Sequence, residues 1–248
     1  MDPAVNRRAQ AVLLLLIGGA VLRASLTDLH LRYVKAGLQP FLVAAGVLLV
    51  VAALMTLWYD LGVPPATDRG GSDHADHDGH GHGPGGPRIA WLLLLPVFGL
   101  LLISPPALGA YTAGRTGTAL TGTSSDFEPL PDRDPVRITI LDYASRAVFD
   151  DGNTLTGRRV ELTGFAMPAK PDGWYLTRMV VSCCAADARP IKVALTGAVP
   201  SGLAADGWLR VIGRYDPAKV TDPVNGGQIP ALAVDAVTPI GPPAEQYE

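Results

Sequence analysis

The sequence contains only two cysteines among its 248 residues, and they are adjacent, at positions 183 and 184. A chain without further cysteines cannot build a conventional disulfide framework, so a disulfide bond within one molecule would have to join these two neighbours. Histidine is also scarce, and none of the five histidines lies beyond residue 82. A Cys–His nucleophile in the second half of the chain is therefore excluded unless another chain supplies the base.

The sequence also contains few charged residues. Charged residues make up 17% of the chain, and the formal net charge is -3. Without a basic excess there is no reason to expect a nucleic-acid partner. The sequence also lacks a phosphate-binding glycine loop, an HExxH motif and a serine elbow, so an ordinary hydrolase or nucleotide enzyme is not expected.

What the sequence does have is long apolar runs, concentrated before residue 111. The mean hydropathy of +0.24 is high for a soluble protein of this size. We expect residues 1–111 to form a transmembrane region with three spanning helices, at about 9–26, 38–59 and 89–110. The second run contains about the 20 apolar residues that a bilayer core requires, and the proline inside the third is tolerated in a spanning helix. The lipid bilayer is thus the first expected partner.

The first of these runs allows two interpretations. Arg7 and Arg8 precede a short apolar run that ends near Arg23, a pattern that also fits a signal peptide. We favour a spanning helix, because no convincing cleavage site follows. Arg7 and Arg8 then place the N-terminus in the cytoplasm. With three spans, the protein is expected to be a multi-pass protein of the cell membrane whose C-terminal domain is extracytoplasmic.

A histidine-rich loop at 60–88 separates the second and third predicted spans. It contains four histidines within nine residues in a glycine-rich background: His74, His77, His80 and His82. Imidazole groups suit Zn, Ni, Cu and Co, and a flexible loop can fold around an ion at the expense of selectivity. The alternative is a hydrophilic linker whose polar residues only keep it in water.

The second half has the composition of a folded domain. A linker rich in Gly, Thr, Ser and Pro is predicted at 112–134, a domain at 135–240 and a tail at 241–248. The domain is expected to open with a short strand at 136–140 and a helix that stops before Gly152. Five strand patterns then follow: 158–167, 173–182, 190–197, 207–215 and 229–240. One helix beside five short strands predicts a soluble, mainly-β, OB-like small barrel, since closing the sheet leaves no exposed edge.

The adjacent cysteines occur where the second of these strands should end. Neighbouring side chains on a regular strand point to opposite faces, so Cys183 and Cys184 cannot reach one target unless the strand breaks. The "AADA" run that follows is poor strand sequence, which predicts a turn or a single helical turn near Cys183. Such a turn would gather Cys183, Cys184 and Asp187 on one side.

Four roles remain open for this cluster on side-chain chemistry alone. Two thiolates and a carboxylate favour Zn or Cu(I), although a tetrahedral site would lack one ligand. The thiols could instead form a strained vicinal disulfide. Thiol catalysis would need a lowered pKa, for which Arg178, Arg189 and Lys192 are the nearest cations in sequence. In the fourth role the two cysteines only pack as small hydrophobic residues.

The sequence resembles the YcgQ-type family of bacterial membrane proteins, and the likeness covers nearly the whole chain. It is carried by "GRRVELTGF", "RMVVSCCAADARPIKV" and "GWLRVIGRY", of which "SCCAADA" is the most specific. The resemblance implies an accessory subunit of a two-component membrane system, paired with a YcgR-type permease of many spans. It makes Cys183, Cys184 and Asp187 the motif residues but assigns them no catalytic role.

The leading hypothesis is a non-enzymatic accessory subunit of a membrane permease that binds a soft metal ion, Zn or Cu, through the Cys-Cys motif. Two alternatives remain open: a membrane-anchored thiol oxidoreductase, and a scaffold with packed cysteines. No other cofactor is expected.

Overall fold

The computed structural model describes residues 3–62, 99, 106–120 and 127–248. These residues form two compact units. The first consists of Met1–His30 and Gly37–Pro105, and the second of Leu31–Ala36 and Pro106–Glu248. The short segment 31–36, although it lies between the first two helices in sequence, therefore belongs to the unit that contains the C-terminal domain.

The first unit contains two long helices, α1 (Pro3–Leu26) and α2 (Gln39–Gly62). Short 3-10 turns, η1 (Asp28–Arg32) and η2 (Ala36–Leu38), follow the first helix and precede the second. Both long helices are long and apolar enough to cross a membrane by length and composition, which agrees with the first two predicted spans. Residues 63–88 of the histidine-rich loop lie outside the described residues, as does most of the third predicted span, 89–110. The end of that span differs from the prediction, because residues 106–110 belong to the second unit, where the amides of Leu108 and Ala110 donate to Tyr247 and Asp206.

Small residues bring α1 and α2 into close contact. The buried small positions recur every seventh residue on each helix: Ala11, Gly18 and Ser25 on α1, and Gly46 and Ala53 on α2. A Cβ added to Gly46 would lie 2.8 Å from the Cγ of Leu22 and 3.3 Å from the carbonyl oxygen of Gly18. Helices in lipid associate through such small residues because their backbones can then approach closely.

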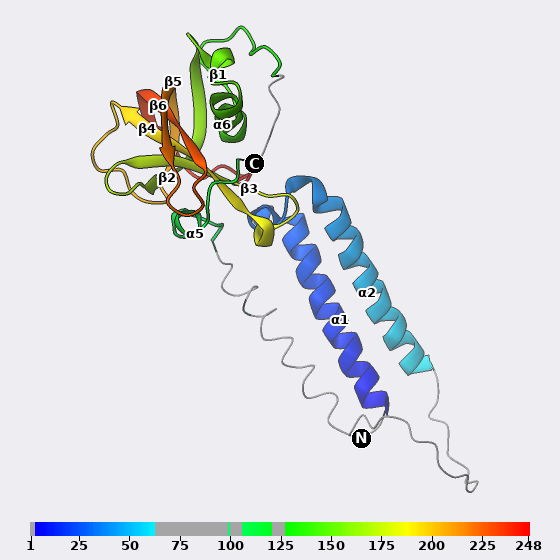
Figure 1. The fold of residues 1–248 in the computed structure, drawn as a ribbon. Helices are drawn as coiled ribbons and strands as arrows, with labels where there is room; N and C mark the ends of the chain where they lie inside the picture. The colour runs from blue at the N-terminus through cyan, green and yellow to red at the C-terminus, as the bar shows by residue number, and fades with distance from the viewer. Residues whose placement is uncertain (1–2, 63–98, 100–105, 121–126) are drawn as a thin grey trace, which may run out of the picture. The chain divides into compact units, whose positions relative to one another are not determined.

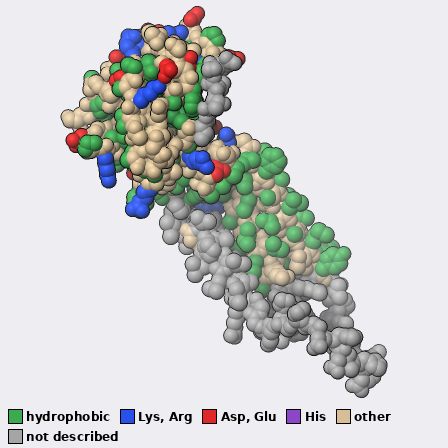
Figure 2. Space-filling view, viewed as in Figure 1, with side chains coloured by type: hydrophobic (Ala, Val, Ile, Leu, Met, Phe, Trp, Pro, Cys, Tyr) green, Lys and Arg blue, Asp and Glu red, His purple; other side chains and the backbone are tan. Residues whose placement is uncertain are grey.

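The opposite faces of this helix pair are apolar and exposed. Large hydrophobic side chains are exposed along both helices, among them Leu15, Leu26, Phe41, Leu48, Met55 and Trp58. In Figure 2 hydrophobic side chains cover the visible face of the pair. Such an outer surface is typical of helices whose surroundings are as apolar as their side chains.

The second unit is built on a closed five-stranded barrel (Figure 1). Its strands are β2 (Arg159–Pro168), β3 (Trp174–Val180), β4 (Arg189–Gly197), β5 (Trp208–Thr221) and β6 (Gln228–Pro239). They pair in the order β2-β3-β4-β6-β5, and β5 returns to β2. Only the β4–β6 pair within this ring is parallel. The predicted small mainly-β barrel is thus confirmed, with β5 extending beyond the predicted end at residue 215.

A single helix closes one end of the barrel core. Helix α6 (Ile140–Phe149) begins directly after Thr139, whose hydroxyl accepts a hydrogen bond from the Asp142 amide at 3.0 Å. Four side chains of this helix are fully buried in the main core: Ile140, Tyr143, Ala144 and Ala147. The expected strand at 136–140 is correspondingly shorter, because β1 consists only of Val136–Arg137 and Ile140 is the first helical residue.

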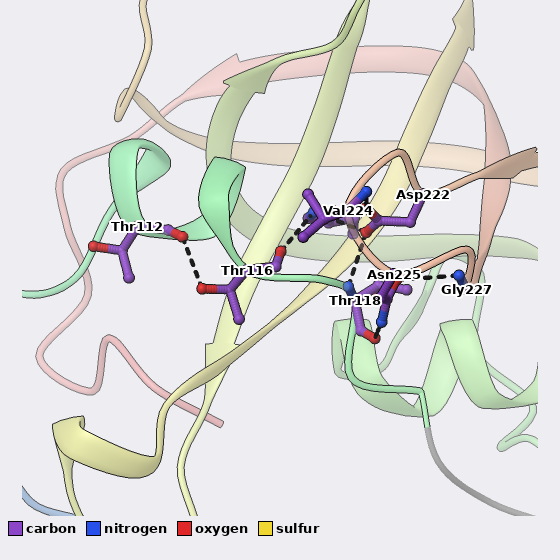
Figure 3. A network of polar contacts seen from close by, with 8 residues as sticks. Thr112, Thr116, Thr118, Asp222, Val224, Asn225 and Gly227 are labelled. Atoms are coloured by element: carbon purple, nitrogen blue, oxygen red, sulfur yellow. Dashed lines mark hydrogen bonds and ion pairs between the residues drawn. The ribbon is translucent and has the colours of Figure 1, made fainter.

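Part of the predicted linker 112–134 folds onto the barrel instead of running free. A short helix, α5 (Ala110–Arg115), starts this segment, and Leu130 near its end is buried in the main core. The reason for the difference is a buried polar network that composition does not reveal (Figure 3). It joins the segment to β4 and to the turn between β5 and β6.

At the centre of this network is an ion pair between Lys192 and Asp222, whose side chains are 2% and 0% exposed. The Lys192 ammonium donates to the Asp222 carboxylate at 2.8 Å and to the carbonyl oxygen of Thr116 at 2.9 Å. The Thr118 amide donates to the same carboxylate at 2.8 Å, and the Asn225 side chain donates to the Thr118 carbonyl. Burial favours the neutral acid, but these hydrogen bonds outweigh it and lower the pKa of Asp222.

The predicted tail at 241–248 is also part of the folded unit. The Tyr247 hydroxyl accepts from the Leu108 amide at 3.1 Å and donates to the Arg32 carbonyl oxygen at 2.8 Å. The Glu248 carboxylate accepts from the first two amides of α6, those of Ile140 and Leu141. Residues 247 and 248 therefore tie segments 31–36 and 106–108 to the barrel and complete the N-terminal cap of α6.

Candidate functional site

The adjacent cysteines lie in a turn that breaks the sheet between β3 and β4. Strand β3 ends at Val180, and a single 3-10 turn, η4 (Ala185–Asp187), starts directly after Cys184. The next strand begins at Arg189. The predicted break in the strand is thus confirmed, and its cause is the short run of alanines and aspartate that disfavours extended structure.

The turn brings the two sulfurs and one carboxylate together. The Sγ atoms of Cys183 and Cys184 are 3.6 Å apart, and the Cys183 Sγ lies 3.0 Å from the Asp187 Oδ2. One ligand atom from each of the three residues lies within 4.8 Å of the others. Cys183 is exposed and Cys184 is half-buried, and neither is in a disulfide bond. The structure therefore places all three motif residues in one accessible cluster.

Asp187 holds this cluster in shape through backbone hydrogen bonds. Its Oδ1 accepts from the Ser182 amide at 2.8 Å, and its Oδ2 accepts from the amides of Cys183 at 2.9 Å and Cys184 at 3.4 Å. A carboxylate that caps the amides at the start of a helical turn satisfies donors that would otherwise lack a partner. Asp187 thus fixes the conformation of the two cysteine residues, whether or not it also binds an ion.

The carboxylate and the thiol shift each other's pKa in opposite directions. The hydrogen bond from the Cys183 thiol, with those from the turn amides, lowers the pKa of Asp187 to about 2. The Asp187 carboxylate, followed by Cys184, raises the pKa of Cys183 to about 12. At neutral pH the site is therefore an ionised carboxylate beside a protonated thiol, and Cys183 is a poor nucleophile in this state.

Two of the three cations that are nearest to the cysteines in sequence, Arg178 and Lys192, are engaged elsewhere. Arg178 donates to the carbonyl oxygens of Thr163 and Glu245, with its guanidinium 5.1 Å from the Trp208 ring centre. Lys192 is paired with Asp222 in the buried network. Neither contributes a hydrogen bond to the cysteines, so neither offsets the effect of Asp187.

Segment 31–36 contributes to the site, and sequence reasoning missed it. Val34 forms an isolated antiparallel bridge with Cys184. The Lys35 amide donates to the Cys183 carbonyl oxygen at 3.0 Å, and the Ala185 amide donates to the Tyr33 carbonyl oxygen at 2.7 Å. The only local signal was the short "RYVK" run with its β-branched and aromatic residues, which looked like a turn between two helices.

A cavity of about 840 Å³ adjoins the turn. Ser182, Asp187 and Arg189 line it on the side of the turn, and Thr112 and Thr116 line it on the side of α5. Its volume is in the range of small-molecule sites. A ligand in this cavity could therefore approach Asp187.

Residues 135–248 match the DUF1980 C-terminal domain. No curated protein and no solved structure matches the chain. The matched range of the DUF1980 C-terminal domain contains the barrel, α6 and the cysteine turn. It leaves out segment 31–36 and α5, which are bonded to that domain in this structure.

Proposed function

We propose that the protein is a non-enzymatic, membrane-anchored subunit that binds a soft metal ion through Cys183 and Cys184. The observation that carries this proposal is the convergence of both sulfurs and the Asp187 carboxylate within 4.8 Å in an accessible turn. Thiolate ligands select Zn(II) or Cu(I) over hard cations such as Mg(II). A metal ion would displace the thiol protons, since the thiolate is the ligand.

The ligand set favours an exchangeable site over a structural one. Two sulfurs and one carboxylate oxygen leave a tetrahedral ion with an open fourth position, whereas structural zinc sites are closed by four protein ligands. The adjoining cavity gives a further donor room to approach Asp187. Such a site is suited to receiving an ion and passing it on.

Thiol redox catalysis is disfavoured by the same geometry. A catalytic thiol requires a lowered pKa, produced by a cation or by the N-terminus of a helix. Here the Asp187 carboxylate raises the pKa of Cys183 to about 12. A nucleophile must be ionised before it reacts, whereas a cation that is attracted by the Asp187 carboxylate would itself displace the thiol proton as it binds.

The metal proposal predicts saturable Zn(II) binding that depends on the two cysteines. The full chain is purified reduced, in detergent, with the four loop histidines (His74, His77, His80 and His82) replaced by asparagine so that the loop does not bind the ion; this variant, which keeps His30, is the loop-histidine-free background. Competition with a chromophoric chelator should show one ion bound per chain. In the same background, Cys183→Ser with Cys184→Ser should abolish this binding.

Two results would contradict the metal proposal. One is the absence of saturable binding of both Zn(II) and Cu(I) to the loop-histidine-free background. The other is unchanged binding after both cysteines are replaced by serine, which would place the ion elsewhere. Comparison with the chain that retains its loop histidines reports separately on the predicted metal binding by that loop.

We further propose that the chain crosses the membrane three times, with the barrel outside the cytoplasm. Segment 31–36 lies between two helices that can span, and it is hydrogen-bonded to the domain that contains the barrel. The two must be on the same side of the bilayer. After α2 the chain is on the other side, so one further crossing is needed before the barrel. We assign it to the apolar run that starts at residue 89 and ends before Pro106, where the second unit begins.

Reporter fusions test this topology. Alkaline phosphatase fused after Glu248 should be active, and the same reporter inserted into loop 60–88 should be inactive. Two active fusions, or two inactive ones, would exclude an odd number of crossings between the two points. The likeness to YcgQ-type proteins adds a multi-span permease as the proposed partner, for which stoichiometric co-purification from membranes in mild detergent is the test.

A further inference from the structure

The cysteine turn forms one side of a short antiparallel pair, and residues 33–35 form the other side. Three contacts define this pair: the Val34–Cys184 bridge, the 3.0 Å bond from the Lys35 amide to the Cys183 carbonyl, and the 2.7 Å bond from the Ala185 amide to the Tyr33 carbonyl. Both hydrogen bonds join backbone atoms. They hold the peptide groups on either side of Cys184, one of the two residues whose sulfurs converge.

We infer that residues 33–35 position the two cysteines, so that metal binding to the sulfurs and pairing with this segment stabilise each other. The inference rests on the proposed function. Adjacent side chains reach one ion only if the backbone departs from a regular strand. Asp187 fixes that departure from within the turn through its bonds to three amides, and residues 33–35 fix it from outside.

The linkage between the two events has a thermodynamic consequence. If pairing favours the conformation that binds the ion, the ion must favour pairing by the same factor. Segment 31–36 connects α1 to α2 in sequence. Occupancy of the metal site therefore stabilises the conformation of the connection between two helices that can span a membrane. The matched family domain at 135–248 would lack this part of the site.

Hydrogen exchange in the full chain tests the inference without any substitution near the site. The protein is studied in detergent in the loop-histidine-free background, with and without saturating Zn(II). Exchange of the Lys35 and Ala185 amides should slow about fivefold with the metal, the factor that corresponds to one net hydrogen bond. Amides within α6 serve as the reference and should be unchanged.

A pair of substitutions at Lys35 tests the reverse effect, that of the pairing on metal binding. Lys35→Pro removes the amide that bonds to Cys183, and proline also favours an extended preceding residue, which suits Val34 in its bridge. Lys35→Ala removes the charge but keeps the amide. We expect the Kd for Zn(II) to rise about fivefold in Lys35→Pro relative to Lys35→Ala.

The outcomes separate this inference from the proposed function. Zn(II) binding with unchanged exchange at both amides, or with equal affinity in the two Lys35 variants, would refute the linkage and leave the metal site standing. No binding at all in the loop-histidine-free background would refute both. Should Lys35→Pro fail to fold, as judged by circular dichroism, the exchange measurement on the unsubstituted turn decides.

Discussion

Replacing Asp187 by asparagine is expected to increase the alkylation rate of Cys183 at pH 7.5 at least tenfold, in the metal-free protein. The carboxylate raises the pKa of Cys183 to about 12, whereas a free cysteine has a pKa of about 8.5. Without the anion a larger fraction of the sulfur is thiolate. The gain is partly offset because a thiolate of lower pKa is intrinsically less nucleophilic.

The measurement is the rate of iodoacetamide labelling, with tandem mass spectrometry to separate adducts on Cys183 from those on Cys184. In the unsubstituted protein the labelling rate should still be rising steeply at about pH 11, because the raised pKa of Cys183 delays its ionisation. In Asp187→Asn it should level off near pH 9 to 10. Asp172→Asn, at an exposed position away from the turn, is the matched control and should behave as the unsubstituted chain. Equal rates in all three proteins would show that Asp187 does not suppress the thiolate.

Replacing Lys192 by methionine is expected to lower the free energy of unfolding of the barrel unit by about 3–5 kcal/mol. The Asp222 side chain is fully buried, and Lys192 is its cationic partner at 2.8 Å. Removal of one partner leaves an uncompensated charge that the remaining amide donors satisfy only in part. For a unit of this size the melting temperature should fall by about 10 °C or more. Thermal denaturation followed by near-ultraviolet circular dichroism in detergent measures the change.

A surface ion pair on the same barrel provides the control. Lys219 pairs with Asp151 at 2.7 Å, but the Asp151 side chain is 82% exposed. Lys219→Met should therefore change the free energy of unfolding by less than about 1 kcal/mol. Adding Asp222→Asn to Lys192→Met should restore part of the lost free energy of unfolding, because the buried carboxylate charge is then gone. If Lys192→Met lowers the free energy of unfolding no more than Lys219→Met does, the buried network does not hold residues 116–118 against the barrel.

The pH dependence of the same pair follows from the direction of its pKa shift. The pKa of Asp222 is lowered in the folded protein, so its contribution to stability is present above the unfolded pKa of about 4 and is lost as pH falls toward the folded value. Because Lys192 is one of the groups that lower this pKa, Lys192→Met should lose less stability than the unsubstituted chain on acidification from pH 5 to pH 3.

Much of the barrel could be predicted because its signals are local. Alternating apolar residues such as Ile191, Val193 and Leu195 mark buried strand positions, and Gly or Pro clusters bound each strand. All five predicted strands are present, with ends shifted by a few residues. The first strand of the domain was predicted too long, because Ile140 continues the alternation of Val136 and Ile138. In the structure Ile140 is instead the first residue of the helix that Thr139 caps.

The candidate site was predictable in its residues but not in its surroundings. The poor strand propensity of the run after Cys184 was enough to predict the turn that gathers the sulfurs with Asp187. Nothing local indicated that Asp187 would raise the pKa of Cys183 instead of leaving the nearby cations to lower it. That outcome depends on which charged group the turn places in contact with the sulfur, and on Arg178 and Lys192 being held elsewhere.

By itself the sequence determined the first two apolar helices, the number of barrel strands and their positions along the chain, and the break that brings two adjacent cysteines to one side. These features follow from periodicity and propensity within a few residues. Only the tertiary structure decided that residues 33–35 pair with the cysteine turn, that residues 116–118 are held by Lys192 and Asp222, and that Tyr247 and Glu248 join the folded unit. Most of these contacts use backbone amides and carbonyls, which nearly every residue carries, and they join segments up to 215 residues apart, so local sequence does not specify them.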